Sequence, residues 1–213
     1  MPVSPNHGPR RHGLRPQLIV LHYTAMASAN AAIERLCDPQ AEVSAHYVIS
    51  RTGEVSQLVP EELRAWHAGA GEWLGQGDVN SRSVGIELDN NGMSPFPEPL
   101  MAALEELIPQ IMARHGITAK GVIGHSDMAP GRKIDPGPRF DWLRLERQGF
   151  ARLRGGGSIP ATPDAAAFRA CAHALGYTAD VEDKTLLEAV RFRFRPQATG
   201  PLCAEDFAAL PRL

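Results

Sequence analysis

No stretch of this sequence stays apolar for long enough to cross a membrane as a helix. Such a helix needs roughly 18 consecutive apolar residues, and no run in the chain reaches that length. The N-terminal segment, residues 1–15, is rich in proline, histidine and arginine and lacks the apolar stretch of a secretory signal. We therefore expect no membrane span and a cytoplasmic location. A periplasmic location is the alternative if a signal has been removed.

Cysteine is scarce, which limits the kinds of metal site and cross-link that the chain can form. Cys37, Cys171 and Cys203 lie far apart and form no CxxC pair, which excludes a zinc cluster of thiolates. An odd number of widely spaced cysteines is typical of reduced thiols in a cytosolic protein. The HExxH pattern of many zinc peptidases is also absent, which argues against that class of enzyme.

The chain also lacks an excess of charge of either sign. Its 22 Lys and Arg residues against 24 Asp and Glu residues give a net charge of −2, which argues against nucleic acid or an anionic membrane as partner. Hydrophobic residues make up 43% and charged residues 22% of the 213 residues, so a packed core is expected. This length suits one domain, or one domain with a small second one. We favour a monomer.

Two strand-like segments are each followed by a histidine. Residues 17–21 precede His22, and residues 121–124 precede His125. The loop after His125 holds three prolines and two glycines, and Asp135 lies ten positions (135 − 125) after the histidine. Imidazole nitrogen and carboxylate oxygen are zinc ligands, so the loop could fold back to complete a zinc site. A surface loop with a solvated histidine and an Asp-Pro turn is the alternative.

The remaining pattern predicts strands that alternate with helices. We expect a helix over 28–36 with Ser28 as its N-cap, a hairpin of strands 45–50 and 54–59, and a strand over 83–88. Residues 66–83 are rich in glycine and predict a long loop. A helix over 100–112 should kink or break at Pro109, with Gly116 as its C-cap. The fold class is α/β, with a mixed sheet between helices.

The composition changes at residues 154–158, where three consecutive glycines begin a linker that runs to 163. Residues 1–153 then form the larger domain and 164–213 a small helical one. Thr162 and Pro163 are the expected cap and first position of the first of three helices, which follow apolar stripes ending near residues 175, 194 and 210. Because about 50 residues are marginal for an independent core, we expect these helices to dock on the larger domain.

Five sequence blocks identify a family that the chain resembles. In chain order they are Leu21-His-Tyr-Thr24, Val43-Ser-Ala-His-Tyr-Val-Ile49, Ala65-Trp-His-Ala-Gly69, Val84-Gly-Ile-Glu-Leu88 and the segment from Gly124-His125 to Arg132-Lys-Ile-Asp-Pro-Gly-Pro138. These blocks resemble the zinc-dependent N-acetylmuramoyl-L-alanine amidases, which are related to peptidoglycan recognition proteins and phage amidases. The resemblance covers about residues 15–150. The C-terminal segment resembles the small three-helix peptidoglycan-binding-like module of some of these enzymes.

The resemblance implies a single catalytic zinc ion with His22, His125 and Asp135 as ligands. Three protein ligands leave the fourth position to water, which is typical of a catalytic zinc site. Glu87 is the implied base that accepts the proton of this zinc-activated water, and Lys133 the residue that stabilises the oxyanion. The implied substrate-binding residues are Trp66, His67, Asn80 and Arg132.

Several of these residues have alternatives. Asp127 could be the carboxylate ligand in place of Asp135, and His46 could be a ligand but is interpreted as a packed or supporting histidine. Asp89 lies on the same face as Glu87 and is the second candidate for the base. Glu87 could instead form a salt bridge, Lys133 could be a solvated lysine, and Trp66 could be a core residue. Ala45 stands where phage and recognition-protein relatives often carry a tyrosine, so the role of that tyrosine would fall to Glu87.

The implied reaction is hydrolysis of the amide bond between N-acetylmuramic acid, or its 1,6-anhydro form, and L-alanine of the stem peptide. Peptidoglycan fragments are then the partners, and recycled soluble anhydro-muropeptides are the expected substrates in the cytoplasm. The alternative is a protein that binds peptidoglycan without cleaving it, since some relatives lose the metal. The presence of His22, His125, Asp135 and Glu87 argues against that alternative.

Overall fold

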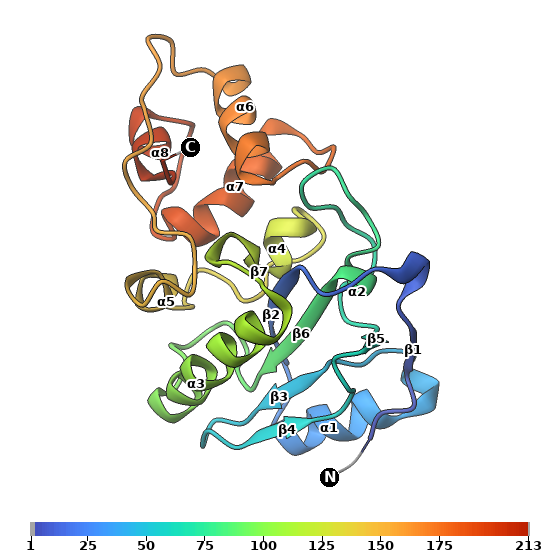
Figure 1. Cartoon of the computed structure of the whole chain (residues 1–213). Coiled ribbons are helices and arrows are strands. Elements are labelled where there is room, and N and C mark those ends of the chain that lie inside the picture. The colour runs from blue at the N-terminus through green and yellow to red at the C-terminus, as the bar shows by residue number, and fades with distance from the viewer. Residues whose placement is uncertain (1–2, 213) are drawn as a thin grey trace.

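A five-stranded sheet forms the centre of the computed structural model, which describes residues 3–212 (Figure 1). Its strands lie in the order β4-β3-β6-β2-β7, and only the β3–β4 pair is antiparallel. Their bounds are β2 Leu18–Tyr23, β3 Tyr47–Ile49, β4 Val55–Gln57, β6 Ser83–Leu88 and β7 Val122–Gly124. This arrangement confirms the predicted mixed sheet and the hairpin, although β3 and β4 are shorter than expected.

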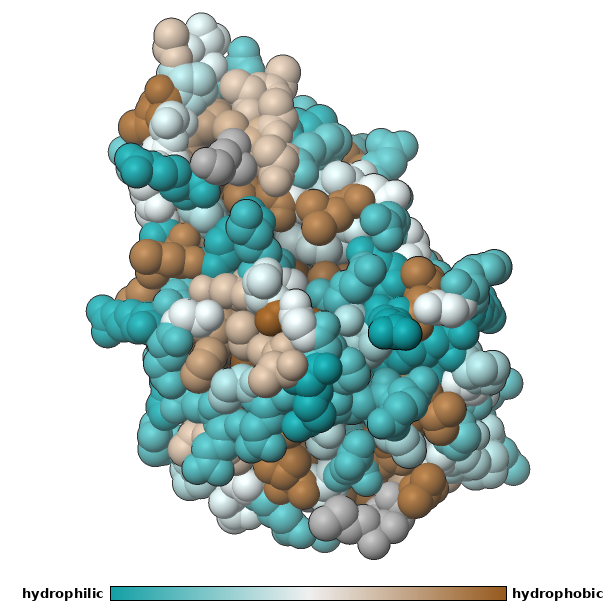
Figure 2. All heavy atoms as spheres, viewed as in Figure 1, coloured by the Kyte–Doolittle hydropathy of each residue, from teal (hydrophilic) through white to brown (hydrophobic). Residues whose placement is uncertain are grey.

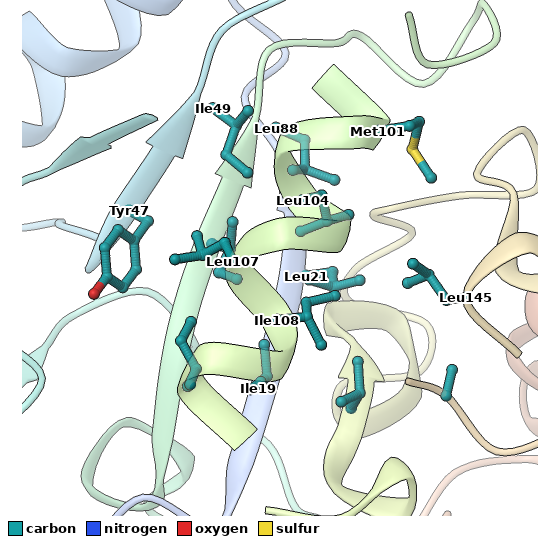
Figure 3. Close-up of a cluster of buried hydrophobic side chains, with 14 of the residues drawn as sticks. Ile19, Leu21, Tyr47, Ile49, Leu88, Met101, Leu104, Leu107, Ile108 and Leu145 are labelled. Atoms are coloured by element: carbon teal, nitrogen blue, oxygen red, sulfur yellow. The ribbon is translucent and has the colours of Figure 1, made fainter. Parts of the chain in front are cut away.

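One face of the sheet packs against α3 (Glu98–His115) and α5 (Trp142–Arg147). Because side chains alternate along a strand, Ile19 and Leu21 of β2 point to this face together with Leu88 of β6. Figure 3 shows Leu104 and Ile108 of α3 packing against these strand residues. The burial of apolar side chains on this face holds the helix across the sheet.

The opposite face is covered in two parts. Helix α1 (Ala29–Cys37) packs against Val48 of β3, and Ser28 caps it by accepting a hydrogen bond from the backbone N–H of Ala31 at 3.2 Å, as predicted. The C-terminal helices cover β2 and β7; they are α6 (Ala165–Leu175), α7 (Asp183–Phe194) and α8 (Ala204–Ala209). Figure 1 shows α1 at one end of the molecule and these three helices at the other.

The three C-terminal helices share a hydrophobic cluster with the sheet, as the expected docking requires. Leu18 and Val20 of β2 lie in one buried cluster with Phe168, Leu175 and Phe207 of the helices. The short helix α4 (His125–Met128) contacts α7 directly. Residues 154–163 form no helix in this structure and contain only an isolated bridge between Gly156 and Pro211. The domain limits at 153 and 164 stay a prediction.

Two local expectations need correction. Helix α3 is not broken at Pro109 but runs on to His115, and Gly116, with a φ of 66°, caps it as predicted. The buried side chains on both sides of the proline, such as Leu104 and Ile111, keep the helix on the sheet although one backbone hydrogen bond is lost. Helix α6 is capped by Asp164 and not by Thr162, because the Asp164 carboxylate accepts a hydrogen bond from Ala167 N at 2.9 Å.

Two small strands and three short α-helices, α4 and α5 among them, were not predicted. Strand β1 (His7–Pro9) pairs antiparallel with β5 (Leu63–Ala65) in a separate two-stranded sheet. The predicted loop 66–83 is largely irregular but ends in α2 (Val79–Arg82). Such elements are too short to show a periodic pattern in the sequence.

The surface in the view of Figure 2 is mainly hydrophilic, with hydrophobic residues scattered among the polar ones. Among residues 3–212, no helix combines the length and the apolar character that a membrane span needs.

Candidate metal centre and groove

Two histidines and an aspartate converge at the carboxyl ends of β2 and β7. These strands are parallel neighbours with Leu21 paired to Gly124, so His22 and His125 follow side by side. The loop after α4 folds back, and the backbone N–H of Ser126 donates to the carbonyl of Asp135 at 2.9 Å. The sheet topology therefore brings together three residues that the sequence separates by up to 113 positions.

The three side chains meet atom to atom. His22 Nδ1 lies 2.9 Å from His125 Nδ1 and 2.9 Å from Asp135 Oδ2, and His125 Nδ1 lies 3.0 Å from the same oxygen. One potential ligand atom from each residue lies within 4.8 Å of the others, and all three residues are buried. This geometry has the donor set and the spacing of a site for a single metal ion.

The protonation states suit metal binding. Burial, followed by the neighbouring His125, lowers the pKa of His22 to about 4, so its imidazole is neutral at pH 7. Burial alone would raise the pKa of Asp135, but its contacts with His125 and His22 outweigh burial and hold that pKa well below its usual range. A neutral imidazole and an ionised carboxylate are the forms that bind a metal.

The second ring nitrogen of each histidine is occupied by the protein. His125 Nε2 donates to the carbonyl of Ala68 at 2.9 Å, which leaves Nδ1 as an acceptor that faces the site. His22 Nε2 lies 2.9 Å from Nδ1 of His67. Converging lone pairs of nitrogen and oxygen repel one another unless a cation lies between them, so the residues present fit a zinc ion.

Glu87 lies beside this centre without a partner of its own. It pairs with His22 in the β2–β6 register, and its Oε2 atom is buried without a hydrogen-bond partner among the residues that the structure describes. Burial, followed by the charge of Asp135, raises the pKa of Glu87 to about 8, although Lys133 opposes the shift. An unpartnered buried carboxyl oxygen is costly, which is typical of a functional group.

A groove with a volume of about 490 Å³ opens over the centre. Besides the three converging residues, it is lined by Glu87, Lys133, Trp66, His67 and Arg132, which the sequence analysis singled out. It is also lined by residues that the sequence analysis did not select, among them Met26, Arg35, Val43 and Ile134. Arg35 could have been found from its place on the helix that follows the first histidine strand.

Two of the residues expected to bind substrate contact the protein itself. Asn80 does not line the groove, because its side-chain oxygen accepts hydrogen bonds from the backbone N–H groups of His67 and Ala68 at 3.0 and 2.8 Å. Arg132 lines the groove, yet its Nη2 donates to the carbonyls of Ala68, at 2.6 Å, and Ala70. Both side chains support the loop that begins at Trp66.

The two alternative metal ligands, Asp127 and His46, form hydrogen bonds with other parts of the protein. Asp127 accepts hydrogen bonds from Gly124 N, the Tyr177 hydroxyl and Arg193, and so turns away from the metal centre. His46 is buried between its partners, accepting from Gly85 N at 2.9 Å through Nδ1 and facing the Leu63 carbonyl through Nε2.

The second candidate for the base also has other partners. Asp89 accepts a hydrogen bond from the backbone N–H of Ala29 at 3.1 Å and pairs with Arg51 at 3.2 Å. It is absent from the lining of the groove, so Glu87 is the carboxylate of β6 that faces the centre.

The chain is similar to two curated bacterial enzymes. It is 38% identical over 152 residues to N-acetylmuramoyl-L-alanine amidase AmiD of Escherichia coli, a match that covers 64% of this chain and 54% of that protein. It is 35% identical over 159 residues to 1,6-anhydro-N-acetylmuramyl-L-alanine amidase AmpD of Enterobacter cloacae, covering 67% of this chain and 85% of that protein. The chain thus spans about half the length of the first relative and most of the second.

Two solved structures resemble the whole fold. AmiD of E. coli in complex with the substrate anhydro-N-acetylmuramic acid-L-Ala-D-gamma-Glu-L-Lys matches with a TM-score of 0.81 and 31% identity, over 93% of this chain and 89% of that chain. AmpDh3 of Pseudomonas aeruginosa in complex with anhydromuramic pentapeptide matches with a TM-score of 0.82 and 31% identity, over 93% and 91%. The family model for N-acetylmuramoyl-L-alanine amidase matches residues 12–138, which include every residue of the metal centre, and the chain belongs to this family.

Proposed function

We propose that this protein hydrolyses the amide bond between N-acetylmuramic acid, or its 1,6-anhydro form, and L-alanine of the stem peptide. The observation that carries the proposal is the convergence of His22, His125 and Asp135 beside the unpartnered carboxyl of Glu87. The relatives named for this bond, and the structures that hold anhydromuramyl peptides, support it. Peptidoglycan fragments are thus the proposed substrates.

We infer that the metal is one zinc ion held by His22, His125 and Asp135. Bound there, zinc would act as a Lewis acid that lowers the pKa of a water molecule and polarises the scissile carbonyl. Two imidazole nitrogens and one carboxylate oxygen suit this metal.

Side chains of the protein transfer the proton of the attacking water and stabilise the charge that develops on the substrate. In its ionised form, Glu87 accepts the proton of the attacking water at its Oε2 atom and then delivers it to the leaving amine of L-alanine. Lys133 lines the groove next to the centre, where its ammonium stabilises the negative charge that develops on the carbonyl oxygen. Trp66 and the apolar side chains of Val43 and Ile134 line the walls that hold the substrate.

The test compares the parent protein with His22→Ala, His125→Ala and Asp135→Ala. Zinc content and release of free peptide from an anhydro-muropeptide are measured on the same samples. Both should be lost together in each variant, because two remaining ligands bind zinc weakly. One zinc per chain in all three variants would contradict the ligand set. Full zinc in a parent that releases no peptide would favour the alternative, a protein that binds peptidoglycan without cleaving it.

We also propose that the C-terminal helices bind part of the peptidoglycan fragment. A second groove of about 600 Å³ lies on them, with Phe168, Leu187 and Phe192 among its lining residues. Pro138, three positions after the proposed ligand Asp135 (138 − 135), is also among its lining residues, so this groove reaches the chain segment that follows the metal centre. A long substrate could therefore contact both grooves.

The variant Phe192→Ala tests the second groove. If the helices bind substrate, retention of the protein on sacculi should weaken and KM for a soluble muropeptide should rise, with kcat unchanged. If retention and KM both equal those of the parent, the helices only pack on the sheet.

We propose that the enzyme acts in the cytoplasm on recycled, soluble anhydro-muropeptides. The three cysteines are all free in this structure, as expected for a reducing compartment. Fractionation of cells that produce the full-length native protein decides the question. Recovery in the periplasm or on the outer membrane would overturn this location.

A further inference from the structure

A chain of hydrogen bonds runs from His22 to a backbone carbonyl on α2. His22 Nε2 lies 2.9 Å from His67 Nδ1, His67 Nε2 lies 3.0 Å from Ser83 Oγ, and Ser83 Oγ lies 2.6 Å from the carbonyl oxygen of Val79. Each link has the length of a good hydrogen bond. The metal centre is thereby connected to a fixed backbone atom through two side chains.

The last hydrogen bond of this series determines which atom donates and which accepts in each of the others. A carbonyl oxygen can only accept, so the 2.6 Å contact between Ser83 Oγ and the Val79 oxygen must contain the hydroxyl hydrogen of Ser83. The hydroxyl has no second hydrogen, so Ser83 must accept at its contact with His67. The hydrogen of His67 therefore lies on Nε2.

The tautomer of His67 then determines that of His22. Neither side-chain partner of the His67 ring is a carboxylate among the described residues, so nothing there stabilises a buried imidazolium. A neutral imidazole with its hydrogen on Nε2 has a lone pair on Nδ1, which accepts the hydrogen of His22 Nε2. His22 Nδ1 is left with its lone pair directed at His125 and Asp135.

Packing and backbone hydrogen bonds hold the ring of His67 between His22 and Ser83. A Cβ on Gly85 would collide with Cγ, Nδ1 and Cδ2 of the ring, so glycine on β6 leaves the space that the ring fills. Asn80 fixes the backbone at His67 and Ala68 through two hydrogen bonds. The ring packs edge-on against His22, with centroids 5.1 Å apart.

We propose that His67 and Ser83 are positioning residues that fix the tautomer and the orientation of His22 for metal binding. Because both ring nitrogens of His67 are used within the protein, the ring serves the metal ligand rather than the substrate. Partners of this kind typically change metal affinity by about 10–100-fold when they are removed. The inference rests on the proposed function in that zinc is taken as the metal.

The first experiment measures zinc affinity by competition with a chelator. His67→Phe keeps a ring but removes the acceptor, and Ser83→Ala removes the anchor; each should weaken zinc binding by about 10–100-fold. His67→Asn returns an acceptor oxygen near the place of Nδ1 and should recover part of the loss. Ser81→Ala is the matched control, since Ser81 is a buried serine that accepts from Arg11 N, while the His67 ring is hydrogen-bonded to His22 and Ser83.

The second experiment reads the tautomer directly in the zinc-free protein. Nitrogen-15 NMR of the His22 ring should show the hydrogen on Nε2 in the parent and a mixture of tautomers in Ser83→Ala. Thermal melting of the same zinc-free samples verifies that each variant is folded.

Two results would overturn the inference: a hydrogen on Nδ1 of His22 in the parent, or zinc affinities of His67→Phe and Ser83→Ala equal to that of Ser81→Ala. A parent that binds no zinc would contradict the proposed metal instead, and the tautomer measurement would still test the hydrogen-bond chain.

Discussion

Glu87 is the residue on which the proposed chemistry depends most. It reaches the groove because it lies in register with His22 on the neighbouring parallel strand. Glu87 lines the groove and its Oε2 atom is buried without a hydrogen-bond partner among the described residues, whereas Asp89, two positions later, does not line the groove. Of these two carboxylates, Glu87 is therefore the one placed to exchange a proton with substrate.

The variant Glu87→Gln separates proton transfer from metal binding. Glutamine keeps the size and the hydrogen bonding of glutamate but does not accept a proton, so kcat should fall by about 10²–10⁴-fold. Zinc content should stay at the parent level and KM should change little, because the loss falls on the transition state. kcat, KM and zinc are measured on one sample. Near-normal kcat with full zinc would place the base elsewhere, and lost zinc would make Glu87 a ligand or its support.

The convergence of His22 and His125 could be predicted from the sequence, while the residues packed around them could not. His22 and His125 each follow an apolar run of strand length, and parallel strands end at the same edge of a sheet. The link between His67 and Ser83 has no such signal, because it depends on how the glycine-rich loop folds over β6. The family resemblance placed Asn80 in the groove, but its side-chain oxygen accepts hydrogen bonds from backbone N–H groups instead.

At the scale of elements, strand β6 carries three residues of the proposed site on one face. Ser83, Gly85 and Glu87 alternate along the strand and point away from α3, towards His22 and His67. The intervening residues Val84 and Ile86 belong to the core under α3. A single strand therefore carries both the proposed support of His22 and the proposed base.

Helix α4 joins the metal centre to the C-terminal helices through Asp127. Its carboxylate is almost fully buried and accepts hydrogen bonds from Gly124 N at 2.8 Å, Tyr177 at 2.7 Å and Arg193 at 2.9 Å. Arg193 also stacks on Trp142, with its guanidinium carbon 4.3 Å from the ring centroid. This contact holds the segment that begins at His125, one of the proposed metal ligands.

Asp127→Asn should lower the free energy of unfolding by about 3 kcal/mol, because it leaves the buried Arg193 without a charged partner. Denaturant titration of the zinc-free protein measures the change. Asp164→Asn makes the same chemical change at the exposed N-cap of α6, where asparagine caps about as well as aspartate, and should cost little. Equal losses in the two variants would contradict the role given to Asp127.

Glu61 links the turn before β5 to the end of α3. Its carboxylate accepts hydrogen bonds from Arg114 at 2.7 Å, Tyr47 at 2.6 Å and His115 at 2.5 Å. Burial alone would raise its pKa, but the hydrogen bonds from Arg114, Tyr47 and His115 outweigh burial and lower it to about 2. Because the folded pKa lies below the unfolded one, the interaction stabilises the protein above about pH 4.5 and is lost as the pH falls towards 2.

Glu61→Gln should therefore cost about 2 kcal/mol at pH 7, a figure reduced for the partial exposure of Arg114. The difference between parent and variant in free energy of unfolding should shrink steadily between about pH 4.5 and about pH 2. Chemical denaturation at a series of pH values gives this difference. A difference that stays the same at acid and neutral pH would show that the charge of Glu61 is not involved.

The predicted elements were those with a long periodic pattern. The apolar spacing of α3 identified it, yet Pro109 suggested a break that packing on the sheet prevents. The limits of α6 were misplaced because Thr162 and Asp164 are both good caps, and only the fold decides between them. The strand pair β1 and β5 was missed because three-residue strands leave no pattern in a sequence.

At the scale of the whole molecule, one groove collects residues from segments far apart in the chain. Residues from β2, α1, the loop at Trp66, β6 and the loop 132–135 all line it. The C-terminal helices carry a second groove, and Pro138, three positions after Asp135 (138 − 135), is among its lining residues. This placement supports the proposal that a long peptidoglycan fragment contacts both grooves.

The most direct test of the central claim is to identify which bond is cut, in water enriched in oxygen-18. An anhydromuramyl peptide is digested with the zinc-loaded protein, and the products are analysed by mass spectrometry. Hydrolysis of the proposed amide adds one oxygen-18 atom to the lactyl carboxylate of the sugar and leaves the peptide unlabelled, with a free amine on L-alanine. That labelling, lost in Glu87→Gln, is the predicted result. Label in the peptide carboxylate would indicate a peptidase, and no cleavage by a fully zinc-loaded protein would contradict the assignment as an amidase.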